Sequence, residues 1–249
     1  MAGDGNDNSI RMKKIITKLM IAPVIAGLVI SCGEDDFVAD ANGDAFIISK
    51  IIGTGAEADT LYGLALHAFG NKDFSKVTAT SPANMATDLA PYSGSTYEYF
   101  YETGEDDFTP ALPDQGNYSF SFKFTTAEED TDVDELTDGV LFPAKITRCE
   151  YDATDSRIEI EWEAVTDADY IVIYLKDPDG KLVYISTSLA GSKVSHDVAE
   201  NTTIWYDTPD DGVTYTVIVG AFMYESASAD LNIQAKSIAT ATVVWGGAN

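Results

Sequence analysis

Residues that could form a catalytic centre are scarce in this chain. The 249 residues include two histidines, His67 and His196. His67 lies in the apolar run 64–68, where a lone histidine usually belongs to the core or the surface, and no nucleophile is evident beside His196-Asp197. The sequence has no Gly-x-Ser-x-Gly elbow, zinc-type Cys/His spacing, phosphate-binding loop or dinucleotide fingerprint. We therefore predict a non-catalytic protein without a cofactor; an enzyme would need a cleft lined by perturbed carboxylates.

Calcium is the one metal for which the sequence offers ligands. Asp177 and Asp179 lie in the run Asp-Pro-Asp-Gly, and Asp210 and Asp211 precede Gly212. Clustered carboxylate oxygens suit Ca²⁺, but neither cluster has the EF-hand spacing. Aspartate is also a preferred turn residue. We favour turns over a metal site and keep these four aspartates as weak calcium candidates.

Aromatic residues offer a possible ligand surface. Tyr97, Tyr99 and Tyr101 alternate along one short run and would share one face of a strand. If exposed beside carboxylates, they would form a stacking platform for sugars; if buried, they are sandwich core. Trp205 could likewise be either an exposed stacking residue or part of the sandwich core. We favour the core for these residues and retain all four as ligand-binding candidates.

The first 31 residues have the layout of an export signal. Lys13 and Lys14 precede an apolar run at 19–30. About 12 apolar residues are too few to cross a bilayer but suit a signal peptide. Residues 1–11 do not look like a signal-peptide start, so we take Met12 as the start. The alternative is a short buried helix.

Val-Ile-Ser-Cys at 29–32 resembles the bacterial lipobox, whose cysteine is acylated after the preceding residues are removed. The resemblance implies a mature chain that begins at Cys32 and is held in a membrane by acyl chains. The acidic run 33–36 resembles the signal that sends Bacteroidota-type lipoproteins to the outer face of the outer membrane; the alternative is a solvated acidic tether. Lipidation of Cys32 would leave Cys149 without a disulfide partner, and we expect Cys149 to be a core residue.

The charge balance excludes two classes of partner. The chain has 41 acidic and 15 basic residues, a formal net charge of −26. Nucleic acids need a basic face, so nucleic-acid binding is excluded. An anionic lipid surface would also repel the chain, so membrane attachment depends on the acyl chains.

Alternation with period two predicts an all-β fold. In the run 157–163, Ile158, Ile160 and Trp162 alternate with charged residues, which is typical of a strand with one wet face. We expect strands over 45–52, 61–68, 74–80, 96–101, 117–126, 157–163, 169–175, 181–187, 213–222 and 237–245.

The segment 143–249 resembles a fibronectin type III domain, a seven-stranded immunoglobulin-like sandwich. Trp162 corresponds to the core tryptophan of the second strand, the run 168–174 is similar to the third strand, and 212–221 is similar to the sixth. The resemblance implies that Tyr215 is the tyrosine-corner residue. The usual leucine-x-proline before that tyrosine is absent, and the loop at 225–236 is long. No Arg-Gly-Asp motif is present.

These patterns predict two tandem immunoglobulin-like β-sandwiches after a cleaved lipoprotein signal peptide. The expected division is a leader at 1–31, an acidic tether at 32–43, a first sandwich at 44–127, an acidic linker at 128–142 and the fibronectin type III-like domain at 143–249.

The predicted function is that of a lipid-anchored, outward-facing binding or spacer protein of the outer membrane. One alternative is a polysaccharide-binding accessory lipoprotein of a nutrient-uptake system. Another is an adhesin or fimbria-type subunit that assembles by strand exchange. The expected partners are the membrane, through acyl chains on Cys32, and either a polysaccharide or a surface protein complex.

Overall fold

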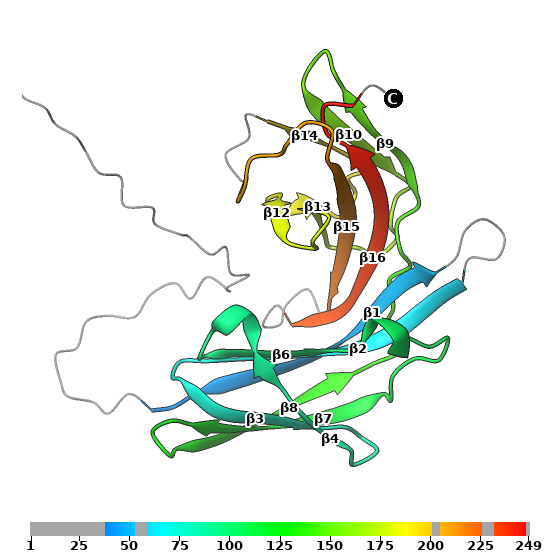
Figure 1. The fold of residues 1–249 in the computed structure, drawn as a ribbon. Coiled ribbons are helices and arrows are strands. Elements are labelled where there is room, and N and C mark those ends of the chain that lie inside the picture. The colour runs from blue at the N-terminus through cyan, green and yellow to red at the C-terminus, as the bar shows by residue number, and fades with distance from the viewer. Residues whose placement is uncertain (1–37, 53–58, 201–204, 226–231, 248–249) are drawn as a thin grey trace, which may run out of the picture. The chain divides into compact units, whose positions relative to one another are not determined.

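The computed structural model describes residues 38–52, 59–200, 205–225 and 232–247 (Figure 1). In these ranges the chain consists of strands, loops and two short 3₁₀ helices, η2 (Tyr92–Gly94) and η3 (Glu105–Asp107). No helix in these ranges is long and apolar enough to span a membrane. The all-β prediction is confirmed. The expected leader, Cys32 and the acidic run 33–36 lie outside the described residues.

The first sandwich contains two facing layers of antiparallel strands. One layer has the order β4 (Ala86–Asp88), β3 (Phe74–Thr80), β7 (Gly116–Phe124) and β8 (Glu129–Leu136). The facing layer has the order β1 (Ala41–Ile52), β2 (Asp59–Gly70), β6 (Glu98–Glu102) and β5 (Ala90–Pro91).

The aromatic face of β7 fills the space between these layers. Its burial alternates strictly, and four buried rings lie on the inner face: Tyr118, Phe120, Phe122 and Phe124. The rings of Phe120 and Phe122 stack with centroids 6.1 Å apart. Gly43 on β1 lies against Phe120, where an added Cβ would fall 2.2 Å from the ring. The core therefore requires a residue without a side chain at position 43.

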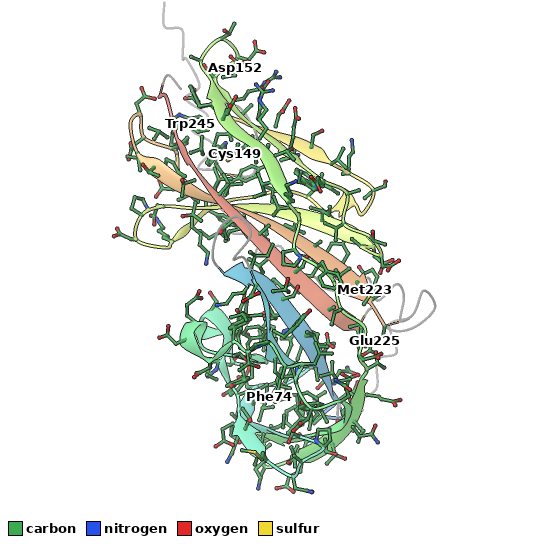
Figure 2. The ribbon with its side chains drawn as sticks, turned by 90° about the vertical axis from the view of Figure 1, so that its right-hand side faces the viewer. Phe74, Cys149, Asp152, Met223, Glu225 and Trp245 are labelled. Atoms are coloured by element: carbon green, nitrogen blue, oxygen red, sulfur yellow. The ribbon has the colours of Figure 1, made fainter. Side chains whose placement is uncertain are left out.

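The second sandwich has the strand arrangement expected from the fibronectin type III resemblance. One layer has the order β14 (Ser195–Ala199), β10 (Arg157–Trp162) and β9 (Ile146–Asp152). The facing layer has the order β12 (Leu182–Ile185), β11 (Tyr170–Lys176), β15 (Thr214–Tyr224) and β16 (Ile233–Val244), and β13 (Leu189–Ala190) pairs with β11. Figure 2 shows Met223 and Glu225 at one end of the β15–β16 pair and Trp245 at the other.

Two residues of this second sandwich have the expected structural roles. Trp162 is buried in the core together with Ile158 and Ile160. The hydroxyl of Tyr215 accepts a hydrogen bond from the backbone N–H of Asp210 at 2.9 Å. In a tyrosine corner the tyrosine hydroxyl bonds to the backbone a few residues upstream, and Tyr215 does so here. The two-sandwich prediction for the described residues is confirmed.

A single sheet of nine strands runs through both sandwiches. Strand β1 pairs with β2 on one side and, in parallel, with β16 on the other, from Ile47 opposite Ala235 to Lys50 opposite Ile238. The buried Ser49 hydroxyl donates a hydrogen bond to the carbonyl oxygen of Leu141 at this junction. Strand β1 therefore contributes to the core of the first half and joins the sheet of the second half through β16.

The acidic run expected to be a solvated linker is a strand. Residues 129–136 form β8, which pairs with β7 from Gly116 opposite Leu136 to Lys123 opposite Glu129. The expectation of a linker at 128–142 was wrong for these residues, because their carboxylates have specific partners. The expected tether at 32–43 is also too long, because Ala41–Gly43 already belongs to β1.

Those partners are backbone N–H groups of β1. The carboxylates of Asp130, Asp132 and Asp134 accept hydrogen bonds from three alternate residues of β1, namely Ala41 at 3.0 Å, Gly43 at 2.9 Å and Ala45 at 2.8 Å. The pairing of β1 with β16 begins only at Ile47, so in the described ranges no strand pairs with this edge of β1 at these N–H groups. Charged acceptors thus satisfy and cover an open sheet edge. We name this arrangement the aspartate ladder.

Candidate functional site

The tyrosines considered as a stacking platform do not share an exposed face. Tyr99 is 9% exposed, and its hydroxyl donates to the carbonyl oxygen of Phe74 at 3.3 Å. Tyr101 packs against the same core, whereas Tyr97 lies outside β6 and is 40% exposed. Because Tyr99 and Tyr101 of β6 pack against the first core while Tyr97 is exposed, the structure does not form the platform of three tyrosines.

The side chain of Trp205 is partly buried and packs against the core of the second sandwich. Its indole N–H donates to the carbonyl oxygen of Ala199 at 3.0 Å, and its ring packs on Tyr184 and edge-on to Trp245. The polar group of this side chain is therefore already satisfied within the protein. The neighbouring Tyr206 is 51% exposed.

The four weak calcium candidates are turn residues. The Asp177 carboxylate accepts the backbone N–H groups of Asp179 at 3.0 Å and Lys181 at 2.8 Å, which closes a turn. The backbone of Asp210 is held by Tyr215, and Asp211 lies beside Gly246. In the described part of the chain, none of the four belongs to a group of three converging acidic, histidine or cysteine ligands.

Both histidines have neighbours that account for their positions. The His67 ring nitrogen Nε2 lies 3.1 Å from the Glu98 carboxylate. His196 Nε2 lies 2.8 Å from the Tyr184 hydroxyl, and burial lowers the pKa of His196 below its usual value. In the described residues, neither side chain has a serine or cysteine as its hydrogen-bond partner.

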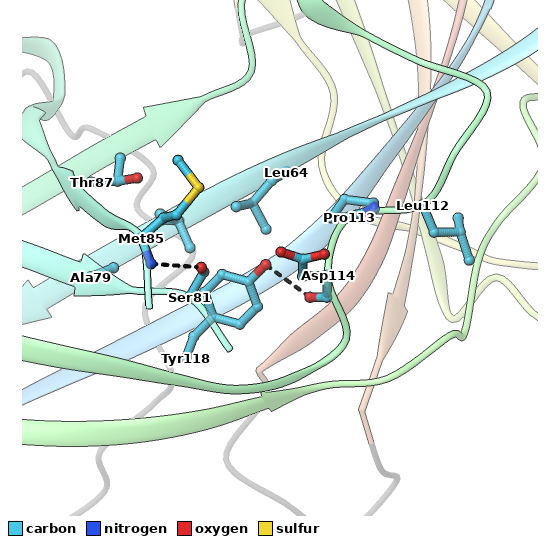
Figure 3. A pocket seen from close by; sticks show the side chains of 10 residues that line it. Leu64, Ala79, Ser81, Met85, Thr87, Leu112, Pro113, Asp114 and Tyr118 are labelled. Atoms are coloured by element: carbon cyan, nitrogen blue, oxygen red, sulfur yellow. Dashed lines mark hydrogen bonds between the residues drawn. The ribbon is translucent and has the colours of Figure 1, made fainter. Parts of the chain in front are cut away.

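A shallow pocket opens at one end of the first sandwich (Figure 3). Its volume is about 340 Å³, and ten residues line it: Leu64, Leu66, Ala79, Ser81, Met85, Thr87, Leu112, Pro113, Asp114 and Tyr118. The Tyr118 hydroxyl donates to the backbone carbonyl of Asp114 at 2.9 Å, and Ser81 Oγ accepts the Met85 N–H at 3.2 Å. Burial raises the pKa of Tyr118 to about 12, so its hydroxyl stays neutral.

A group of three carboxylates lies where the two sandwiches share their sheet. Asp44 on β1, Asp134 on β8 and Glu225 directly after β15 offer oxygen atoms within 4.8 Å of one another. We name this group the acidic triad. Burial is the main cause that raises the pKa of Asp44 well above its usual value, and the charges of Asp134 and Glu225 raise it further. Burial, with the charge of Asp134, raises the pKa of Glu225 to about 7.

Sequence reasoning did not find the acidic triad, because its members come from three distant strands. One local signal was present. Asp44 is an acidic residue inside the otherwise largely apolar strand Ala41–Ile52, on the same face as Phe46 and Ile48. An acid at such a position needs a partner, but the sequence does not say which one.

No protein-family model and no curated protein matches this chain. Among solved structures, the two-domain fibronectin type III segment of chicken tenascin aligns at 13% identity, with 72% of this chain and 91% of that chain covered and a TM-score of 0.30. The BSP domain of a biofilm-associated protein aligns at 7% identity, covering 81% of this chain and 51% of that one, with a TM-score of 0.27. The 47-kilodalton lipoprotein of Treponema pallidum aligns at 9% identity, covering 80% and 51%, with a TM-score of 0.27.

Proposed function

We propose that this chain is a non-catalytic, lipid-anchored display protein of the outer membrane that carries two joined sandwiches as a binding or spacer module. The observation that carries the proposal is the position of β1. This strand begins at Ala41, nine positions after the proposed lipidated Cys32, and it pairs with strands of both sandwiches. A chain anchored at its N-terminus would thus be held through its central strand.

The shared sheet suits a spacer because it leaves no free hinge at β1. Strand β1 is 12 residues long and is bonded to β2 along that whole length. On its other edge, β16 and the aspartate ladder continue the hydrogen bonding. Tension on the anchor would therefore be carried by several strands together rather than by one loop.

The charge of the chain is compatible with display at a crowded surface. With a formal net charge of −26, the protein would repel anionic lipid and stay solvated. Attachment would then depend on the acyl chains alone. The charge also gives a clear test, because removal of the acylated cysteine should release the whole protein.

Metabolic labelling with an alkyne fatty acid in a lipoprotein-exporting bacterium tests the anchor. We expect the wild-type chain to be labelled and membrane-bound, and Cys32→Ala to be unlabelled and soluble. Cys149→Ala is the matched control, since it removes the other cysteine of the chain and should keep the label. An unlabelled wild-type chain, or a labelled Cys32→Ala chain, would overturn the proposal. Protease treatment of intact cells then reports whether the domains face outward.

Polysaccharide binding is the second candidate function, and exposed aromatic residues near β6 favour it. Tyr92 and Tyr97 are 49% and 40% exposed, and the Tyr92 ring packs edge-on against Phe100. Affinity electrophoresis with soluble polysaccharides should show retardation that is lost in Tyr92→Ala and Tyr97→Ala. Tyr206→Ala is the control for an exposed tyrosine on the other sandwich. If soluble polysaccharides do not retard the wild-type chain, polysaccharide binding is excluded as a candidate function.

A further inference from the structure

We propose that the acidic triad, Asp44, Asp134 and Glu225, binds a divalent cation of the calcium type that joins the two sandwiches at their shared sheet. The proposal is independent of the display function, because it depends only on groups within the described residues. The three side chains come from β1, β8 and the end of β15, so one ion would link strands from both halves. Figure 2 places Glu225 at the end of β15 that is remote from Trp245.

The negative charges of the acidic triad are not balanced by a basic side chain among the described residues. Oxygen atoms of the three carboxylates lie within 4.8 Å of one another. In the described part of the chain, no lysine, arginine or histidine forms an ion pair with any of the three. Like charges at this spacing repel strongly at a partly buried site. The cluster must therefore take up a positive charge, either as protons or as a cation.

The acidic triad also contains acceptor oxygens that are buried without a hydrogen-bond partner among the described residues. Asp44 is only 4% exposed, and its Oδ1 is buried without a hydrogen-bond partner among the described residues. Its other oxygen, Oδ2, accepts the N–H of Ile233 at 3.1 Å. The Glu225 oxygen Oε1 is likewise buried and without a partner. An unsatisfied buried acceptor is costly, and a coordinated cation would satisfy both atoms at once.

Backbone groups hold the carboxylates in place for such an ion. The N–H of Ile233 fixes the Asp44 carboxylate, and the N–H of Ala45 fixes Asp134 through its Oδ2 at 2.8 Å. The other oxygen of Asp134 has a long contact of 3.4 Å with the Asn232 amide, and the carboxyl groups of Asp134 and Glu225 also interact with each other. Asp44 thus keeps one oxygen without a partner among the described residues, and a cation between Asp134 and Glu225 would take the place of the contact between their carboxyl groups.

The ligand atoms of the acidic triad indicate which class of cation it would bind. All three ligands are carboxylates, which favour hard ions such as Ca²⁺ over zinc, whose structural sites use cysteine and histidine. Calcium binds oxygen at ~2.3–2.6 Å, so ligands on opposite sides of the ion lie ~4.6–5.2 Å apart. The spacing of at most 4.8 Å in the triad is compatible with that geometry. Further ligands would come from water or from the second oxygens of the carboxylates.

The competing explanation is a proton shared between Glu225 and Asp134. Both groups affect each other's pKa, and burial favours the neutral form of each. A shared proton would neutralise one charge, but it would leave Asp44 Oδ1 without a partner. The two explanations differ in a direct way, since only the cation site responds to added calcium.

The test uses the purified full-length chain after treatment with a chelator, with thermal melting followed in Ca²⁺, Mg²⁺ or neither. At calcium concentrations about 100-fold above the dissociation constant, we expect the wild-type Tm to rise by about 5–10 °C. Asp44→Asn and Glu225→Gln should abolish that rise. Asp44→Asn should also raise the Tm in chelator, because it removes a buried negative charge while it keeps an acceptor for the Ile233 N–H.

Terbium luminescence provides a second readout at the site itself. Tyr224 precedes Glu225 in the chain, and excitation of nearby tyrosine should sensitise a bound Tb³⁺ ion. The signal should disappear in Glu225→Gln and compete with Ca²⁺. The matched controls are Asp177→Asn and Asp211→Asn, which change turn aspartates and should leave both readouts unchanged. Absence of any calcium or magnesium effect on the wild-type chain, or its loss in the turn variants alone, would overturn the proposal.

Discussion

The carboxylate of Asp134 accepts the backbone N–H of Ala45 at 2.8 Å, although 89 positions separate the two residues in sequence. This contact is the innermost rung of the aspartate ladder, and Asp134 is also a member of the acidic triad. One side chain therefore takes part both in covering the edge of β1 and in the proposed cation site. The junction of the two sandwiches therefore involves strand β8 as well as β1.

Removal of a rung of the aspartate ladder should destabilise the protein. Asp132 accepts the N–H groups of Gly43 and Val133, so Asp132→Ala leaves both without this acceptor. We expect a loss of about 1–3 kcal/mol in the free energy of unfolding, measured by urea denaturation. Asp132→Asn should lose less, because an amide oxygen can still accept. Thr131→Ala, at an exposed position of the same strand, is the control and should change little. Equal losses for Thr131→Ala and Asp132→Ala would contradict the role of the ladder.

Gly43→Ala should destabilise the first sandwich by overpacking. The new Cβ would fall 2.2 Å from the ring of Phe120, which is buried and cannot move freely. We expect a loss of about 1–3 kcal/mol, measured by denaturant unfolding. Gly104→Ala is the matched control, since its Cβ would meet only the mobile carboxylate of Asp107. A Gly43→Ala chain as stable as the Gly104→Ala chain would show that the packing at Phe120 can adjust.

The stability of the second sandwich should depend on the protonation of His196. Burial lowers the folded-state pKa of His196 below 6.5, so protons bind the unfolded chain more readily. The stabilisation is present above about pH 6.5 and is lost as the pH falls below that value. We therefore expect wild type to lose more stability than His196→Gln between pH 7.5 and pH 5. Parallel pH profiles for the two proteins would contradict this expectation.

Cys149 should be an unreactive thiol in the folded protein. Burial, with a smaller contribution from the charge of Glu150, raises its pKa to about 11. The thiolate fraction at pH 8 should then be roughly 100-fold lower than for a free cysteine. In a Cys32→Ala chain, which leaves Cys149 as the one cysteine, the reaction with a disulfide reagent should be slow in buffer and fast in denaturant. A fast reaction in buffer would place the thiol in a more open environment.

The two sandwiches should unfold together. They share a nine-stranded sheet, and β1 contributes to the first core while it pairs with β16 of the second. Differential scanning calorimetry should therefore show a single transition whose calorimetric and van't Hoff enthalpies agree. Ser49→Ala, which removes the hydrogen bond to Leu141 at the junction, should lower the Tm without splitting the transition. Two resolved transitions in the wild type would indicate that the halves fold independently.

The sequence by itself determined many of the strands and their buried faces. The alternation in β7 and β10 was visible because side chains in a strand alternate between two faces, so one buried face leaves a local pattern with period two. The buried position of Trp162 could be predicted for the same reason, whereas the tyrosine-corner role of Tyr215 was implied by the fibronectin type III resemblance.

Only the tertiary structure decided how distant strands meet. The run 129–136 was interpreted from its charge as a linker, although Asp130, Asp132 and Asp134 alternate as strand residues do. Their partners are N–H groups of β1, almost ninety positions earlier, which no local pattern could reveal. The acidic triad has the same origin, because its members lie at positions 44, 134 and 225. Local periodicity fixes which way a side chain points within its strand, but the pairing of β1 with β16 and its contact with β8 fix what that side chain meets.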